Sequence, residues 1–295
     1  MSLFFLVIGD LKRIGIIKSC SKKEGLKKMT DYHKQWVGRI FDCVASQYGE
    51  GSCSFFNYFG KRLVEQSPIE ANWQALDVAT GKGAISFPLA EKVGPSGRVV
   101  GIDISERMLK EMAIAAQKRG IDRIDLLQMD AEQLDFSDNS FDAVFCGFAL
   151  FFFPSISKAL SEFKRVLKPE GFLAVSTWGN DSELDALVNR EIDLLCHTTS
   201  LAISPLWSQQ TLQNVLEMAN FKHIKIIEET KEFSYNTPEE WWQSLWAHGT
   251  RAKIEQLSPM QVYDLHERVM KKIKVSNRGN ELKEELQVFY GFAKS

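Results

Sequence analysis

The chain has 295 residues, of which 44% are hydrophobic and 25% charged, and its formal net charge is -2. This is the composition of a folded globular protein with one large domain, or one domain and an additional lobe, and it excludes a disordered chain. Because the charge is nearly balanced, we expect no nucleic-acid partner.

Residues 1–28 differ from the rest of the chain. They contain a basic run at residues 18–28 and an apolar run at residues 3–8. The apolar run is too short to cross a bilayer and lacks a signal-peptide cleavage pattern. We therefore expect an irregular tail that catalysis does not require, and no membrane span. Two helices around a loop at residues 49–54 are predicted next, over residues 32–66.

Short apolar runs alternate with helical stretches over residues 73–178. The predicted strands are residues 75–79, 99–103, 125–130, 142–146 and 172–177, and the predicted helices are residues 84–93, 106–119 and 157–167. Runs rich in Val, Ile, Leu and Phe indicate strands that are buried on both faces. Because helices connect these strands, we predict an α/β fold with an open, doubly wound, mostly parallel sheet.

This alternation weakens after residue 180. Helices are predicted over residues 182–196, 209–219 and 260–274, with another beginning at Pro238, and strands over residues 222–229 and 286–293. We assign residues 73–180 to a cofactor-binding core and residues 181–295 to the remaining core strands and a helical substrate lobe.

The segment from Asp77 to Gly83 follows a predicted strand and precedes a helix, which is the context that nucleotide binding requires. Its small residues let a ligand approach the backbone, and the next helix offers free N–H groups. Asp103 and Asp130 end the next two strands. Ligands of open α/β sheets bind at this carboxyl edge. A tight turn would explain the glycines alone, but the three strand ends together favour a nucleotide-like cofactor.

The cysteines and histidines do not suggest a metal site. None of the five cysteines, Cys20, Cys43, Cys53, Cys146 and Cys196, belongs to a CxxC pair, and their number is odd. This argues against a disulfide framework and a zinc site, and we expect a reducing, cytoplasmic setting. No group of His, Cys and carboxylate residues has ligand spacing, so we expect no catalytic metal.

These motifs resemble those of the class I S-adenosylmethionine-dependent methyltransferases. The similarity rests on DVATGKG at residues 77–83, GIDIS at 101–105 with Met108, MDAEQL at 129–134, FDAV at 141–144 and LKPEG at 167–171. It is nearest to the ubiquinone/menaquinone-biosynthesis type and related small-molecule methyltransferases. The resemblance implies a Rossmann-like sheet of seven strands, S-adenosylmethionine as cofactor, S-adenosylhomocysteine as product, and N-terminal helices over residues 29–72 that cover the cofactor.

The resemblance also implies a set of cofactor contacts. They are Tyr48, Asp77, Ala79, Thr80, Gly81, Gly83, Asp103, Ile104, Met108, Asp130, Ala131, Cys146 and Phe148. Asp103 would hold the ribose and Asp130 the adenine amino group, whereas Cys146 and Phe148 would line the methyl end. Tyr48 would close over the cofactor, although the sequence also allows it to be a core aromatic.

Two features depart from the family pattern. Lys82 stands where many relatives have a small or polar residue, which predicts a more basic turn. Residues 148–153 are all apolar, and the family's amino-methylating signature of Asn or Asp, two prolines and an aromatic residue is missing. This argues against DNA adenine or protein glutamine as the acceptor.

We expect the acceptor to be a small, apolar or aromatic molecule that is methylated on oxygen or carbon. Phe151 would face it from the sheet, and a lobe helix with Trp241, Trp242 and Trp246 would cover it. A helix buried by its aromatic stripe explains the same tryptophans, and Trp207 belongs to the same lobe.

A general base is needed only if the acceptor must lose a proton before or during attack. His197, His223 and His248 lie in the C-terminal part of the chain, and each also fits a surface or packing role. His248 is the candidate for a catalytic residue because it is expected to share a helix turn with the tryptophans of the lobe helix.

Two other functions compete with methyl transfer. A nicotinamide-dependent dehydrogenase would require a third glycine where Ser86 stands, after Gly81 and Gly83. A non-catalytic S-adenosylmethionine-binding protein on the same fold is the alternative, and the complete set of cofactor motifs argues against it.

Overall fold

A computed structural model describes residues 22–51, 54–196, 208–276 and 282–295. Its centre is a seven-stranded sheet with the order β3-β2-β1-β4-β5-β7-β6. The strands are β1 Gln74–Val78, β2 Arg98–Asp103, β3 Ile124–Gln128, β4 Phe141–Gly147, β5 Leu167–Trp178, β6 Lys222–Tyr235 and β7 Leu282–Lys294. The helices are α2 Lys22–Val44, α3 Phe55–Glu65, α4 Ser86–Val93, α5 Glu106–Lys118, α6 Ile156–Val166, α7 Glu183–Cys196, α8 Gln209–Met218, α9 Pro238–Ser244, α10 Arg251–Ile254 and α11 Pro259–Ser276, with short 3-10 turns η2 Leu150–Phe152 and η3 Leu245–Ala247.

The predicted doubly wound sheet is confirmed. Strands β1 to β5 pair in parallel, and β7 is antiparallel to both β5 and β6. The strand order reverses between β1 and β4, where the chain crosses from one side of the sheet to the other. Such a switch point opens a crevice at the carboxyl ends of the strands. The sequence predicts the cofactor motifs at these same strand ends.

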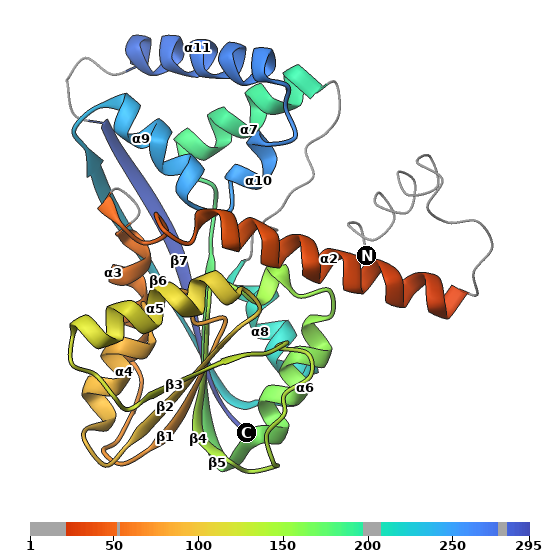
Figure 1. Cartoon of the computed structure of the whole chain (residues 1–295), viewed down its shortest axis with the longest axis vertical. Coiled ribbons are helices and arrows are strands. Elements are labelled where there is room, and N and C mark those ends of the chain that lie inside the picture. The colour runs from red at the N-terminus through yellow and green to blue at the C-terminus, as the bar shows by residue number, and fades with distance from the viewer. Residues whose placement is uncertain (1–21, 52–53, 197–207, 277–281) are drawn as a thin grey trace.

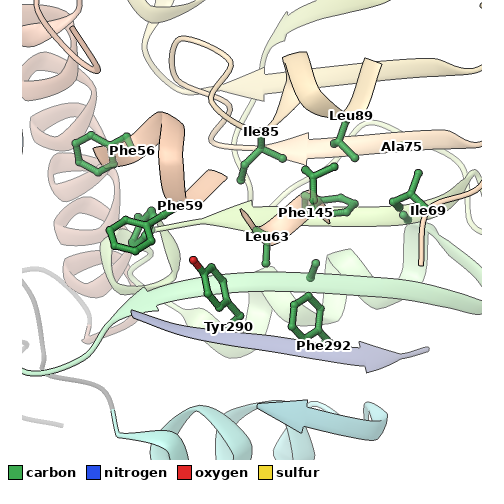
Figure 2. Close-up of a cluster of buried hydrophobic side chains, with 14 of the residues drawn as sticks. Phe56, Phe59, Leu63, Ile69, Ala75, Ile85, Leu89, Phe145, Tyr290 and Phe292 are labelled. Carbon is green, nitrogen blue, oxygen red and sulfur yellow. The ribbon is translucent and has the colours of Figure 1, made fainter. Parts of the chain in front are cut away.

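Helices cover both faces of the sheet (Figure 1). Helices α3, α4 and α5 lie on one face, and α6 and α8 lie on the other. The first face buries a cluster that includes Phe59 and Leu63 of α3, Leu89 of α4 and Tyr290 of β7 (Figure 2). Helices α5, α6, α8 and α9 begin after a Ser or Thr whose side chain caps the helix. The hydroxyl of Ser105, for example, accepts a hydrogen bond from the backbone N–H of Met108 at 3.1 Å.

Helix α2 crosses the carboxyl edge of the sheet, between the sheet and the C-terminal lobe (Figure 1). It begins at Lys22, so residues 22–28 continue this helix and are not part of an irregular tail. Its side chain Asp42 accepts hydrogen bonds from the Ser105 hydroxyl at 2.6 Å and from the backbone N–H of Arg107 at 3.2 Å. These contacts attach α2 to the start of α5, where the N–H groups at the helix N-terminus favour a carboxylate.

The C-terminal lobe has a hydrophobic core of its own. It consists of α7, which follows β5, and of α9, η3, α10 and α11, which are inserted between β6 and β7. Its buried side chains include Val188, Trp241, Trp242 and Leu265. Pro238 begins α9 as predicted, but the chain tightens into a 3-10 turn at Leu245, so this helix is shorter than the tryptophan pattern suggested. Within the described residues, no helix combines the length and apolarity needed to cross a membrane.

We predict that Phe59→Ala lowers the free energy of unfolding by about 3–5 kcal/mol, because its ring is fully buried and the truncation leaves a cavity. Urea unfolding at pH 7 measures the change. Tyr263→Ala on α11 is the control, since Tyr263 is 62% exposed and its loss should cost less than about 0.5 kcal/mol. A loss below 1 kcal/mol for Phe59→Ala, by the same mutational scale, would contradict the packing described here.

Candidate functional site

The buried carboxylate of Asp77 stabilises the turn between β1 and α4. Its Oδ2 accepts hydrogen bonds from the hydroxyls of Thr80 at 2.8 Å and Ser86 at 2.6 Å. Burial raises the pKa of Asp77 to about 7. Ala79 and Gly81 have φ of 56° and 54°, a left-handed conformation that a non-glycine residue seldom adopts. Asp77 thus fixes the shape of the turn and contributes no surface to the cavity above it.

Asp103 at the end of β2 joins this turn to the next helix. Its Oδ2 accepts the backbone N–H of Gly81 at 2.9 Å, and its Oδ1 accepts the N–H of Ser105 at 2.8 Å. Burial raises the pKa of Asp103 to about 6. Each carboxylate oxygen can accept more than one hydrogen bond, so both oxygens keep capacity for a ligand.

A lysine from α2 occupies the acidic end of the site. Nζ of Lys34 lies 2.7 Å from Oδ2 of Asp130 and 2.6 Å from Oε2 of Glu132. Burial acts to lower the pKa of Lys34, but its hydrogen bonds to the two carboxylates outweigh burial and raise it. Glu132 is buried and also accepts the backbone N–H of Ser155 at 2.6 Å. Lys34 therefore pins α2 onto the loop that follows β3.

These elements surround a cavity at the carboxyl edge of the sheet, which we call the strand-edge cavity. Nine of the predicted cofactor contacts line it: Tyr48, Ala79, Gly81, Asp103, Ile104, Met108, Asp130, Ala131 and Phe148. Helix α2 contributes Lys34, Val37 and Phe41 to the same lining. The four other predicted contacts, Asp77, Thr80, Gly83 and Cys146, are buried around it and do not line it.

Those four residues support the wall of the cavity. Thr80 lines a smaller hollow next to the turn, together with Tyr48 and Lys82. At Gly83, φ is 88° and an added Cβ would lie 2.7 Å from the Phe87 ring, so the position requires glycine. Cys146 is completely buried, and burial raises the pKa of its thiol. Lys82 pairs with Glu50 at 2.7 Å, so its charge is partly neutralised at the turn.

Phe148 marks the boundary between the strand-edge cavity and a second cavity. Its φ of 53° places it in the left-handed region, which is strained for a bulky residue. The ring stacks on Trp178 with centroids 4.2 Å apart, and its backbone N–H donates to the carbonyl of Ser176 at 2.9 Å. Four side chains line both cavities: Phe41, Tyr48, Phe148 and Phe152.

The second cavity lies beneath the C-terminal lobe, and we call it the lobe cavity. It encloses about 1010 Å³ of empty space, part of it open to solvent. Its aromatic side chains are Phe41, Tyr48, Phe55, Phe56, Phe148, Phe151, Phe152, Trp178, Trp241 and His248. Trp242 and Trp246 contribute no surface to it. Trp242 is buried in the lobe core with its ring 5.0 Å from that of His266.

His248 extends into the lobe cavity from the turn after η3. Its ring meets Phe55 edge-on at a centroid distance of 5.9 Å. Protein surrounds the ring, and burial lowers its pKa to about 4, so His248 is neutral at pH 7. Nδ1 faces the backbone N–H of Thr250 at 3.5 Å, which leaves Nε2 to carry the ring proton. Of the other two histidine candidates, His223 is exposed at the start of β6, and His197, like Trp207, lies outside the described residues.

Some residues of both cavities could not be found from the sequence motifs. Lys34, Phe56 and Trp178 reach the cavities from α2, α3 and the end of β5, and Asp185 and Lys253 reach the lobe cavity from α7 and α10. Aromatic spacing in α3 predicts a buried face but not what that face surrounds. The polar residues of the lobe belong to no sequence motif that would have identified them.

Comparison with known proteins assigns most of the region around the strand-edge cavity to a known family. A family model described as Methyltransferase domain matches residues 69–229, more than half of the chain. The chain is 37% identical over 145 residues to an aklanonic acid methyltransferase of Streptomyces sp. strain C5, which covers 49% of this chain and 66% of that protein. It is 34% identical to a nocamycin O-methyltransferase of Saccharothrix syringae over 46% of this chain and 49% of the other.

A demethylmenaquinone methyltransferase of Geobacillus stearothermophilus is 35% identical over 48% of this chain and 63% of its own. The chain thus spans half to two thirds of the length of these relatives.

Two solved structures share the fold. The YcgJ protein of Bacillus subtilis has a TM-score of 0.56 at 19% identity, covering 81% of this chain and 98% of its own. The cyclase SpnF has a TM-score of 0.58 at 19% identity, covering 89% and 96%.

We predict that Lys34→Met lowers the free energy of unfolding by about 1–3 kcal/mol, because it leaves the buried carboxylate of Glu132 without its cation. Urea unfolding at pH 7 tests this. Lys61→Met is the matched control: Lys61 lies on α3 and is 68% exposed, and its pair with Glu65 is long at 3.7 Å. Its loss should cost less than about 1 kcal/mol. Equal losses for the two variants would show that Lys34 acts as an ordinary surface charge.

Proposed function

The chain belongs to the Methyltransferase domain family, and on this premise we propose that it transfers a methyl group from S-adenosylmethionine to a small-molecule acceptor. The observation that carries the proposal is the meeting of two cavities at Phe148. One cavity has the polar and apolar groups that suit an adenosyl cofactor, and the other has an aromatic lining that suits an acceptor. A methyl group passing between them needs only a short path at their common wall.

The strand-edge cavity fits an adenosyl cofactor by the chemistry of its lining. Asp103 offers carboxylate oxygens that can accept hydrogen bonds from ribose hydroxyls. Ile104 and Met108 offer apolar surface for a flat adenine ring. Gly81 has no side chain, and a Cβ there would lie 3.7 Å from the ring of Tyr48, so the turn leaves room beside it for a chain of atoms.

Asp130 would meet the adenine amino group, but its Oδ2 also binds Lys34. Its Oδ1 accepts the backbone N–H of Glu132 at 2.9 Å. Because a carboxylate has about four acceptor sites, Asp130 can hold Lys34 and still accept an amino hydrogen. We propose that Lys34 orients the carboxylate of Asp130 rather than blocking it.

When bound, S-adenosylmethionine supplies a methyl group on a sulfonium that is already activated. The residues of this chain would then provide orientation and exclude water. Phe148 is held in one conformation by its stacking on Trp178 and by the hydrogen bond of its backbone N–H, so it can direct an acceptor ring toward the methyl end. Helix α2 and the lobe would cover the two cavities from outside.

We propose that His248 positions the acceptor and is not its general base. A group with a pKa of about 4 is a poor acceptor of a full proton at pH 7, whereas its neutral ring can form a hydrogen bond. The ring lies among Phe55 and Phe56, where such a bond would be sheltered from water. Trp241 completes this wall, and Trp242 and Trp246 would stabilise the lobe that carries it.

The aromatic lining supports an acceptor with a flat ring that is methylated on oxygen or carbon. The names of the relatives, which mention aklanonic acid, nocamycin O-methylation and demethylmenaquinone, support a small molecule as the acceptor. To test the function, the protein is incubated with methyl-labelled S-adenosylmethionine and the small-molecule or the protein fraction of a cell extract. Label in the small-molecule fraction, with an equal amount of S-adenosylhomocysteine, is expected. Cofactor binding without any label transfer would favour a non-catalytic binding protein.

We predict that Asp103→Ala weakens binding of S-adenosylhomocysteine by about 1–3 kcal/mol, because charge-assisted hydrogen bonds to the ribose are lost. Calorimetry at pH 7.5 measures it. Asp125→Ala is the control, since this carboxylate ends no strand and its side chain is 41% exposed on β3. Unchanged affinity in the Asp103 variant would refute its role.

The same carboxylate predicts a pH dependence. Asp103 has a pKa of about 6, so it loses its charge as the pH falls from 7 to 5. Affinity for S-adenosylhomocysteine should fall over this range in the wild type. Asp77 titrates nearby, so the quantity to compare is the difference between the wild type and Asp103→Asn. A parallel pH dependence in the two proteins would assign the effect to another group.

We predict that His248→Gln raises the KM of an acceptor found in the label experiment more than it lowers kcat. At saturating cofactor, kcat of both proteins should have the same shape between pH 5 and 8, because the wild-type imidazole is already neutral there. If the wild-type kcat instead rose through a pKa between 6 and 7 and the variant lost this rise, His248 would be the general base.

A further inference from the structure

The lobe cavity is aromatic on its sheet side and acidic on its lobe side. Asp181 and Asp185 at the start of α7 and Glu284 of β7 line it, together with Lys253 of α10. The charges of Asp181, Glu284 and Lys253 act on the ionisation of Asp185. Three carboxyl groups therefore share the polar end of the cavity with one lysine, and the apolar acceptor expected from the sequence accounts for none of them.

Glu284 is explained by the fold. It is buried, and its carboxylate accepts hydrogen bonds from the hydroxyls of Ser182 at 2.6 Å and Tyr235 at 2.8 Å. These bonds connect β7 to the start of α7 and to the end of β6. Glu284 thus supplies negative charge to the cavity without needing a ligand.

Asp185 is not explained in this way. Asp185 is half-buried, and it lines the lobe cavity. The Ser182 hydroxyl lies close by, but a hydroxyl has one proton, and that proton is donated to Glu284. Burial and the neighbouring carboxylates Glu284 and Asp181 raise the pKa of Asp185 to about 7. Among the described residues, no other donor is placed on its carboxylate by a hydrogen bond or an ion pair.

Lys253 offsets the negative charge at this end of the cavity only in part, since one lysine faces three carboxyl groups. Its Nζ donates to the side-chain oxygen of Asn189 at 2.8 Å and forms no ion pair within 4 Å in the described part of the chain. Burial lowers its pKa, against the attraction of Asp181, Asp185 and Asp193. Asp185 lies beside two other carboxyl groups that disfavour its charged form, so a ligand that brings a positive charge would be stabilised here.

A second polar group opens into the same cavity. His248 is surrounded by protein and is neutral, and within the described residues its Nε2 has no hydrogen-bond partner. It lies against Phe55 and Phe56, toward the aromatic side. The cavity therefore offers a hydrogen bond near the ring-binding wall and negative charge at the opposite, lobe side.

We propose that the acceptor is an aromatic amine, with its ring against the wall formed by Phe148, Phe56 and Trp178 and its protonated amino group at Asp185. This rests on the proposed methyl transfer, which would act on the ring end. The lobe thus selects acceptors by charge and disfavours carboxylated ones, because an anion would meet three carboxyl groups. Aromatic rings of the wall can also attract the cation through their faces.

Three probes with the same phenol ring and similar length test this proposal: tyramine, which is cationic, 4-ethylphenol, which is neutral, and 3-(4-hydroxyphenyl)propionate, which is anionic. Each is titrated calorimetrically at pH 8 into the full chain, with and without S-adenosylhomocysteine. We expect tyramine to bind at least about tenfold more tightly than 4-ethylphenol, as one charge-assisted hydrogen bond allows, and the propionate to bind most weakly.

Two variants, one without a negative side chain and one without a positive side chain, identify the group that causes the preference for tyramine. Asp185→Asn should reduce the preference for tyramine to about threefold or less, and Lys253→Met should increase it, because each removes one charge from the same wall. Glu183→Gln is the matched control: it removes an exposed carboxylate from the same helix that does not line the cavity, and it should leave the preference unchanged.

Equal affinities for the three probes, a preference for the anion, or no binding of any probe would overturn the proposal. So would a tyramine preference that survives in Asp185→Asn. Failure of the proposed methyl transfer has a different signature, since the protein would then not bind S-adenosylhomocysteine, or would bind it without transferring label, whatever the order of the probes.

Discussion

The left-handed turn between β1 and α4 is the constraint on which the rest of the site depends. Two buried carboxylates hold it: Asp77 binds the hydroxyls of Thr80 and Ser86 beneath it, and Asp103 binds the backbone of Gly81 from the next strand. Their folded pKa values lie above the ordinary value near 4, so their burial destabilises the fold increasingly as the pH rises from about 4 to 7. At Asp103 an amide could not replace the carboxylate, because both side-chain atoms accept a hydrogen bond and an amide nitrogen accepts none.

Backbone strain occurs at two places along the strand-edge cavity. Ala79 and Phe148 both have positive φ although neither is glycine, and both line the strand-edge cavity. Such conformations persist only where the surroundings impose them. For Phe148 the surroundings are the stacked ring of Trp178 and the hydrogen bond to Ser176. Of the two, only Phe148 also lines the lobe cavity, so its strained backbone lies at the boundary between the cavities.

Most of the lobe is inserted between β6 and β7, at the antiparallel edge of the sheet. Strands β6 and β7 form an antiparallel pair that continues from Lys222 paired with Lys294 to Tyr235 paired with Leu282. An insertion at the far end of this pair leaves the parallel strands undisturbed and places α9, α10 and α11 beyond the carboxyl edge (Figure 1). The lobe is stabilised by its own buried residues, so its cavity-facing side is free to carry polar groups such as Asp185 and Lys253.

The sequence by itself determined the sheet and most of the strand-edge cavity. Buried strands have a strong local pattern, and Asp103 and Asp130 had to meet because the carboxyl ends of parallel strands share one edge. Only the tertiary structure decided that Lys34 pairs with Asp130, that Trp241 faces the lobe cavity while Trp242 does not, and that Asp185 lies opposite an aromatic wall. The reason is physical: strand periodicity is a property of neighbouring residues, whereas these contacts join segments far apart in the chain, and their positions depend on how α2 and the lobe pack onto the finished sheet.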